Sequence, residues 1–223
     1  MMKKHSFTAV LLYFPCIIFF LGFSHLMHAA TRHVWSGGNN TSPYDTWEKA
    51  AQTIQTALTG ASAGDIILVT NGTYTSASTV IAQITNAVIM RSVNGPSVTI
   101  MDAQGGGSTD RRCIIISGTA GAVISGFKLK GANNSAWSYN GGAIYMSVAA
   151  TITNCVFENN RVGGRGAAIY MISAGLVTDC VFTNNRATEW NYGYGGAAYM
   201  AVSYTHLRAH ETPEHLVCRL LLE

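Results

Sequence analysis

The carboxylates are the side chains best suited to acid–base chemistry here, and in the turn-rich part of the chain they are Asp102, Asp110, Glu158, Asp179 and Glu189. An enzyme that cleaves a glycosidic bond needs two such groups near one another, and a polysaccharide lyase needs them clustered around a cation beside a basic residue. These carboxylates are scattered, and no nucleophile can be matched with a base. We therefore predict no catalytic residues, no cofactor-binding residues and no metal ligands, and we favour a non-catalytic protein over an enzyme.

A Gly/Asp segment and the cysteines are weaker candidates for a functional site. Gly105-Gly-Gly-Ser-Thr-Asp110 resembles one copy of a calcium-binding Gly/Asp repeat, but no second copy follows it. No disulfide framework is expected, because the cysteines of this part of the chain are few and odd in number: Cys113, Cys155 and Cys180. A redox pair of Cys155 with Cys180 is conceivable, but two buried thiols acting as small apolar residues are the simpler interpretation.

Arginines follow two similar segments of the chain, and Arg161, Arg165 and Arg186 all fall in variable turns. Arg161 and Arg186 are placed to stack as a small basic ladder beside Trp137 or Trp190. An aromatic groove with arginines could bind a glycan, and the alternative is a solvated turn.

Internal repetition shows which elements position these residues. Ile124–Leu129, Ile152–Phe157 and Val177–Phe182 align at steps of 28 and 25 residues. A second block recurs at Gly142–Met146, Ala167–Met171 and Gly196–Met200, at steps of 25 and 29 residues. A period in the twenties indicates a solenoid, and two β-type runs per unit without a helix predict coils of a parallel β-helix.

The alternation of residues predicts which side chains face inward. Ile152, Cys155 and Phe157 point into the coil, whereas Thr153 and Val156 point outward. Stacked coils then form columns, and a polar residue marks the bend between strands. The predicted columns are Ile124/Ile152/Val177, Leu129/Phe157/Phe182 and Phe127/Cys155/Cys180, with Asn154 and Asp179 at the bend.

A leucine-rich repeat is the rival fold. The pattern Ile152-x-x-Cys155-x-Phe157-x-x-Asn160 also fits its template and its period. That fold needs one strand per repeat and a helical return, whereas the second run, Ala-Ile-Tyr-Met, is β-prone. We favour the β-helix.

One helix is expected, over about Thr46 to Leu58. Asp45 and Glu48 form a capping box, and an apolar stripe follows at helical spacing from Trp47 to Leu58. Because a solenoid needs a cap on its apolar end, we expect this helix to cover the first coil. Residues 30–64 then hold an N-terminal strand and the capping helix, and residues 65–201 hold a truncated parallel β-helix.

The N-terminus reads as a secretory signal peptide over residues 1–29. Lys3 and Lys4 precede an apolar run from Ala9 to Phe23, and small residues follow at Ala29 and Ala30. Pro15 and Gly22 shorten the run below the ~20 residues of a membrane span. We expect cleavage near Ala29 and no membrane span afterwards.

The composition changes abruptly at Val202. The string from Val202 to Thr212, and the tail from Leu216 to Leu222, resemble a translated transposase sequencing adapter read in one frame. We therefore exclude residues 202–223 from the fold as an adapter-derived artefact, and expect them to contact nothing specific. The natural protein is expected to continue beyond Met200.

Charge excludes one class of partner. Between residues 30 and 201 there are ten Lys/Arg and eight Asp/Glu, a net charge of +2, and no basic run. We expect no nucleic-acid partner; glycans or molecules of a host or cell surface are the expected partners.

Two short motifs carry a family resemblance. Phe157-Glu-Asn-Asn160 and Phe182-Thr-Asn-Asn185, with Gly141-Gly-Ala-Ile144, resemble the FxxN and GGA[ILV] repeats of chlamydial-type polymorphic outer-membrane proteins. Gly166–Ile169 and Gly195–Ala198 are degenerate copies. The stretch from Ala63 to Pro96 is similar to the N-terminal turns of large bacterial β-helix proteins of the pectate-lyase-like (pectin lyase-like) superfamily.

The resemblance implies an all-β fold, a right-handed parallel β-helix solenoid with an N-terminal capping helix. It implies a bacterial protein that is secreted or held at the outer-membrane surface, a non-catalytic adhesin or a passenger-type scaffold. The alternative is the N-terminal part of a polysaccharide lyase or glycoside hydrolase whose active site lies in downstream coils. Fold alone does not choose between them.

Overall fold

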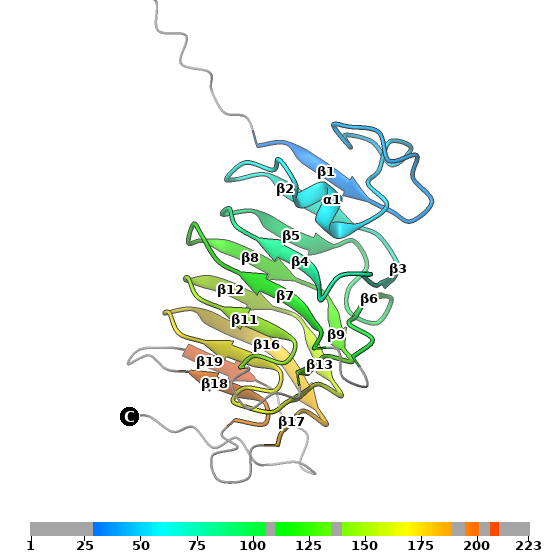
Figure 1. Ribbon diagram of the computed structural model, residues 1–223. Helices are drawn as coiled ribbons and strands as arrows, with labels where there is room; N and C mark the ends of the chain where they lie inside the picture. The colour runs from blue at the N-terminus through cyan, green and yellow to red at the C-terminus, as the bar shows by residue number, and fades with distance from the viewer. Residues whose placement is uncertain (1–28, 106–109, 135–139, 189–194, 201–205, 210–223) are drawn as a thin grey trace, which may run out of the picture.

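The computed structural model describes residues 29–105, 110–134, 140–188, 195–200 and 206–209. Over this part the chain is a mostly β parallel solenoid, whose coils stack from β1 and β2 at one end to β18 at the other (Figure 1). Every pairing between named strands is parallel. The predicted β-solenoid between Ile66 and Met200 is confirmed.

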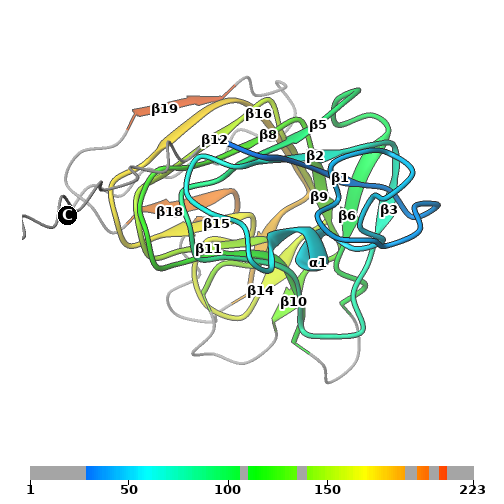
Figure 2. The same ribbon diagram turned by 90° about the horizontal axis from the view of Figure 1, so that it is seen from above.

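The strands form four faces around a common interior (Figure 2). Face A consists of β1 (Thr31–Val34), β2 (Ile66–Val69), β5 (Ile89–Ser92), β8 (Ala122–Ser125), β12 (Ala150–Thr153) and the first half of β16 (Leu176–Thr183). Face B consists of β3 (Gly72–Tyr74), β6 (Thr99–Asp102), β9 (Lys128–Lys130), β13 (Val156–Glu158) and the second half of β16.

Face C consists of β4 (Val80–Ile84), β7 (Arg112–Ile116), β11 (Ile144–Met146), β15 (Ile169–Met171) and β18 (Ala198–Met200). Face D is short and consists of β10 (Asn133–Asn134), β14 (Arg161–Val162) and β17 (Arg186–Ala187). Because the second repeat block forms β11, β15 and β18 rather than a helical return, the leucine-rich-repeat alternative is wrong.

The predicted columns are the observed strand registers. Ile152 pairs with Ile124 and with Val177 in the neighbouring coils, and Phe157 pairs with Leu129 and Phe182. The rings of Phe157 and Phe182 stack at 5.0 Å between centroids with an interplanar angle of 7°. The prediction of inward-facing residues from the alternation of apolar and polar side chains is therefore confirmed.

The bends between faces A and B need left-handed backbone. Asn154 and Asp179 have φ values of 50° and 53°, and the preceding coil has Gly126, with φ 83°, at the same place. Asparagine, aspartate and glycine tolerate this region better than other residues. The prediction of a short polar residue at this bend is confirmed.

The helix begins later than predicted. α1 runs from Ile54 to Leu58, and its N-cap is Thr53, whose hydroxyl accepts a hydrogen bond from the Thr56 amide. The expectation of a helix from Thr46 with Asp45 as its cap is wrong. The carbonyls of Glu48 and Ala50 instead accept hydrogen bonds from the loop after β1, and the backbone of Ala51 bonds with β1. These long-range backbone bonds outweigh the helical pattern.

Helix α1 packs at the first coil. Its residues Ile54, Ala57 and Leu58 are buried in the core. On its other side the Gln55 Oε1 accepts a hydrogen bond from the amide of Gln83 in β4, the terminal strand of face C, at 2.7 Å. The helix thus lies where a further strand of face C would lie. In the described residues, no helix is long and apolar enough to cross a membrane.

The C-terminal segment also contains an element that was not expected. His206–Ala209 forms β19, which pairs in parallel with β16 with a register shift between Thr178 and Cys180. These four residues therefore pair with the solenoid through their backbone, and the expectation that residues 202–223 contact nothing specific stays a prediction. The outer edge of β16 offers unpaired backbone groups, which can accept any extended segment regardless of its side chains.

Candidate functional site

A ladder of tyrosines runs along the outside of face C. Tyr145, Tyr170 and Tyr199 occupy one register position in β11, β15 and β18. Their rings stack at 5.7 Å and 5.3 Å between centroids. We call these three residues the tyrosine ladder.

Strand alternation explains why the tyrosines face outward. In β11 the flanking residues Ile144 and Met146 are buried, so Tyr145 between them points to the other side of the strand. Parallel in-register pairing then places each tyrosine over the next one. The ladder is therefore a direct product of the repeated Tyr in the second block of the repeat.

Two guanidinium groups lie over the ladder. Arg112 in β7 is 5.6 Å from the ring centroid of Tyr145, and Arg165 is 4.9 Å from that of Tyr199. The Arg165 side chain also donates a hydrogen bond to the Tyr199 hydroxyl at 2.9 Å. Both contacts fall within the range of cation–π attraction.

The phenol of Tyr170, the middle residue of the ladder, stays protonated at neutral pH. Burial raises the pKa of Tyr170 above its ordinary value, and the neighbouring Tyr199 and Tyr145 add to the rise, which Arg165 partly opposes. A protonated phenol can both donate and accept a hydrogen bond. The ladder thus offers polar groups at a regular spacing along the solenoid.

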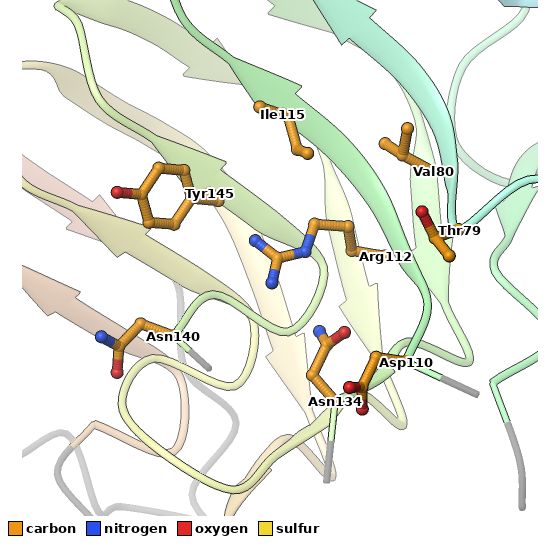
Figure 3. Close-up of a pocket in the computed structure, with 8 residues that line it drawn as sticks. All are labelled: Thr79, Val80, Asp110, Arg112, Ile115, Asn134, Asn140 and Tyr145. Atoms are coloured by element: carbon orange, nitrogen blue, oxygen red, sulfur yellow. The ribbon is translucent and has the colours of Figure 1, made fainter. Parts of the chain in front are cut away.

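An open hollow of about 480 Å³ lies beside the first tyrosine (Figure 3). Its lining combines apolar side chains with a guanidinium, a carboxylate and two amides: Thr79, Val80, Asp110, Arg112, Ile115, Asn134, Asn140 and Tyr145. Figure 3 shows the Arg112 side chain extending toward Tyr145, with Asn134 and Asp110 below Arg112 and Asn140 below Tyr145. The hollow thus offers charged and amide groups beside the apolar side chains of Val80 and Ile115, which a ligand with polar groups could contact.

Face D adds further arginines next to the hollow. Arg161 pairs with Arg186 in register, and both side chains are exposed. Arg161 also pairs with Asn133, which bridges to Arg111. The predicted arginine ladder is therefore confirmed in position.

Five arginines lie in or next to faces C and D, and we call them together the arginine face: Arg111, Arg112, Arg161, Arg165 and Arg186. The hollow and face D are linked through Asn134, which lies in β10 and lines the hollow, and Asn140 accepts a hydrogen bond from the Arg165 amide. Among the described residues of the hollow and face D, Asp110 is the one carboxylate. The sequence shows no long basic run because these arginines come from three different coils: Arg111 and Arg112 from one, Arg161 and Arg165 from another, and Arg186 from a third.

Buried asparagines hold the turn between faces B and D. Asn160 is 1% exposed, and its side chain donates to the Leu129 carbonyl at 3.0 Å and accepts from the Ala132 amide at 3.1 Å. Asn185 in the next coil donates to the Phe157 carbonyl at 2.9 Å. The two amides also bond to one another, from Asn160 Nδ2 to Asn185 Oδ1, at 2.9 Å. The Asn of each Phe-x-x-Asn motif therefore satisfies backbone groups of the preceding coil.

The carboxylates are not brought together. Asp102 pairs with Lys130 at 3.2 Å and Glu158 with Lys128 at 3.3 Å, both on the outside of face B. Asp179 sits at a bend, Asp110 lies in the hollow, and Glu189 falls outside the described residues. In the part of the chain that the structure describes, no three His, Cys, Asp or Glu side chains could hold a metal ion.

The three cysteines are buried and reduced. Burial raises the pKa of Cys113 to about 12. Burial likewise raises the pKa of Cys155, and a hydrogen bond with the neighbouring Cys180 adds to this effect. The thiols act as small core residues, as the simpler interpretation held.

Several parts of the sequence-based interpretation fall outside the described residues, residues 1–28 of the expected signal peptide included. Trp137 and Trp190, proposed to flank the arginines, are among them, and so is most of the Gly/Asp segment, 106–109. The aromatic groups that the structure does place beside arginines are Tyr145 and Tyr199, which the sequence interpretation missed. The signal was present, since a tyrosine recurs at steps of 25 and 29 residues between two inward-facing residues.

Comparison with known proteins identifies the repeats. Residues 154–171 and 179–200 match the sequence model of the Chlamydia polymorphic membrane protein (Chlamydia_PMP) repeat. The β-solenoid thus contains two segments similar to the polymorphic membrane protein repeat, and the resemblance of Phe157–Asn160 and Phe182–Asn185 to that repeat is confirmed, whereas Gly141–Ile144 lies outside the matched residues. No curated protein and no solved structure gives a significant match.

Proposed function

We propose that this chain is an exported, surface-displayed β-solenoid, an adhesin or passenger-type scaffold, that binds acidic glycans through its arginine face and tyrosine ladder. The repeat family is named for membrane proteins, and the N-terminal basic and apolar pattern supports export. The observation that carries the proposal is that both matched repeats place an arginine and a tyrosine on the outer surface in register, Arg161 over Arg186 and Tyr170 over Tyr199.

Charge complementarity supports an acidic ligand. A guanidinium binds a sulfate or carboxylate through two parallel hydrogen bonds, which a lysine cannot reproduce. The arginine face carries five guanidiniums, with Asp110 the one carboxylate in the described hollow and face D.

Spacing supports a polymeric ligand. The tyrosine rings recur at 5.7 Å and 5.3 Å along the stack, close to the ~4.8 Å between neighbouring strands. An extended chain of sugar rings lying along the solenoid would meet a phenol at each of three coils and an exposed arginine at the last two of them. The amide of Asn140 in the hollow adds a group that can bond to sugar hydroxyls.

Binding of the full chain to heparin, measured by biolayer interferometry, tests the ligand class. We expect binding to heparin that weakens with added salt, because exposed charge pairs are screened, and no binding to neutral dextran. Arg161→Ala with Arg186→Ala should weaken binding roughly tenfold, since each exposed ion pair is worth up to ~1 kcal/mol.

Lys128→Ala with Lys130→Ala is the matched control. It removes the same charge from face B, where both lysines pair with carboxylates. Equal weakening by the two double variants would show that net charge alone drives binding. Equal affinity for duplex DNA and heparin would contradict the glycan assignment.

We also propose the finer features of the fold. The winding is right-handed, as strand-crossover connections nearly always are, and α1 caps the apolar end of the first coil. Leu58→Asp should then expose the core and promote association of the chain, which light scattering would detect. Residues 202–223 are proposed to derive from an adapter, which sequencing the gene from its native source would test.

A carbohydrate-cleaving enzyme is the second candidate, and one observation favours it. Asp110 and Arg112 line the same hollow, which brings a carboxylate and a basic group together. Release of unsaturated or reducing ends from a polyuronate by the full chain, lost in Asp110→Asn, would support this candidate over the scaffold.

A further inference from the structure

A buried carboxylate contacts the chain just before the first strand, β1. Asp65 is 4% exposed. Its Oδ1 accepts a hydrogen bond from the Ala30 amide at 2.9 Å, and its Oδ2 accepts one from the Ser62 amide at 2.9 Å. The Arg32 guanidinium contacts the same Oδ2 at 3.4 Å.

The carboxylate is charged at neutral pH. Burial opposes the charge, but the amides of Ser62 and Ala30 and the guanidinium of Arg32 outweigh it and hold the pKa of Asp65 below its ordinary value. Arg32 is shared, because it also donates to the Gly60 carbonyl at 2.9 Å. Asp65 is thus an ionised, nearly buried group with one long contact to a cation.

The Ala30 nitrogen lies at the start of the first strand. The Ala30 carbonyl accepts a hydrogen bond from the Ile66 amide at 2.8 Å, and Thr31 pairs with Ile66. Ala29 and Ala30 are both exposed.

We infer that the Ala29–Ala30 peptide bond is the processing site of the exported chain and that Asp65 is the docking site of the new N-terminus. Hydrolysis consumes one water, leaves a carboxylate on Ala29 and places a protonated amine on Ala30. The atom that now donates as an amide to Asp65 becomes an ammonium at the same position. An amide hydrogen bond is thereby replaced by an ion pair in a nearly buried setting, where charge-assisted bonds are stronger.

The inference rests on the export part of the proposed function and does not depend on glycan binding. Its first test is the intact mass of the exported protein. We expect an N-terminus at Ala30. An N-terminus at another residue of the leader or at Thr31 would overturn the docking site while leaving export intact, and retention of Met1 would overturn both.

The second test compares two trimmed chains, one beginning at Ala30 and one beginning at Ala29. In the longer chain the Ala30 nitrogen is again an amide, and the ammonium is displaced by one residue. We expect the chain that begins at Ala30 to melt higher by roughly 3 °C, about what 1 kcal/mol gives in a chain of this size. The difference should disappear as the pH rises above about 8, where an α-amino group begins to lose its proton.

Asp65→Asn should remove the difference between the two chains. Asp45→Asn is the matched control, because Asp45 is exposed and pairs with Lys49 four residues away; it should leave the difference intact. Equal melting temperatures of the two unsubstituted chains at pH 7, or a difference that persists in Asp65→Asn, would overturn the inference.

Discussion

Truncation of Phe157 tests the in-register core most sharply. The side chain is fully buried, lies between Leu129 and Phe182 in neighbouring strands, and stacks on the Phe182 ring at 5.0 Å. Phe157→Ala leaves a cavity that stacked coils cannot close without breaking register. We expect a loss of ~3–5 kcal/mol in the free energy of unfolding.

Val156→Ala is the control one residue away. Val156 faces outward and is partly exposed, so its truncation should cost about 1 kcal/mol or less. Urea denaturation with a reductant, which keeps Cys155 and Cys180 as thiols, measures both variants. Equal losses, or a larger loss at Val156, would refute the assignment of faces, because a one-residue slip exchanges them.

Four further outcomes are expected. Asn160→Ala should lower the free energy of unfolding by about 2 kcal/mol, because it leaves buried backbone groups unpaired. Asn159→Ala is the control in the same urea titration, and an equal loss there would show that turn conformation alone matters. Gly141→Ala should destabilise by more than about 1 kcal/mol, because Gly141 has φ 74° and a Cβ would press on the Ile144 carbonyl; an unchanged midpoint would contradict this. The thiols of Cys113 and Cys155 should resist a thiol reagent at pH 8 until urea unfolds the chain, because burial raises their pKa values, and rapid reaction of the folded chain would show that the core is open. Replacing His206–Ala209 with four threonines should change the melting temperature by less than about 2 °C, because β19 pairs through its backbone; a larger loss would show that its side chains are specific.

Much of the coil could be predicted from the sequence. The steps between repeats gave the strand register, and alternation gave the inward columns, because both depend on local geometry that repeats in every coil. Ile152 over Val177 and Phe157 over Phe182 follow from these two facts alone.

The helix and the arginine face could not be predicted in the same way. The pattern from Trp47 to Leu58 fits a helix, but backbone bonds from the loop after β1 hold its first part in turns. The arginine face is assembled from residues far apart in the chain, such as Arg112 and Arg161, through the lateral pairing of short strands. Two-residue strands such as β10 carry too little pattern to be recognised.

The tyrosine ladder lies between these cases. Its residues lie inside a repeat that was recognised from the sequence. The predicted columns contained only inward-facing residues, so the outward-facing tyrosines were missed. In a solenoid the outward residue of each strand repeats as regularly as the inward one, so Tyr145, Tyr170 and Tyr199 could have been found by the same reasoning.

The central claim is that the polymorphic membrane protein repeats stack as in-register coils, and excimer fluorescence tests it most directly. Thr153 and Thr178 face outward and pair in neighbouring coils. Replacing both with cysteine and attaching pyrene should give strong excimer emission from the folded chain, with none when pyrene is placed at Thr153 and at Glu158 on face B. Absence of the excimer at Thr153 and Thr178, or equal emission from the control pair, would contradict the stacked-coil structure and the function built on it.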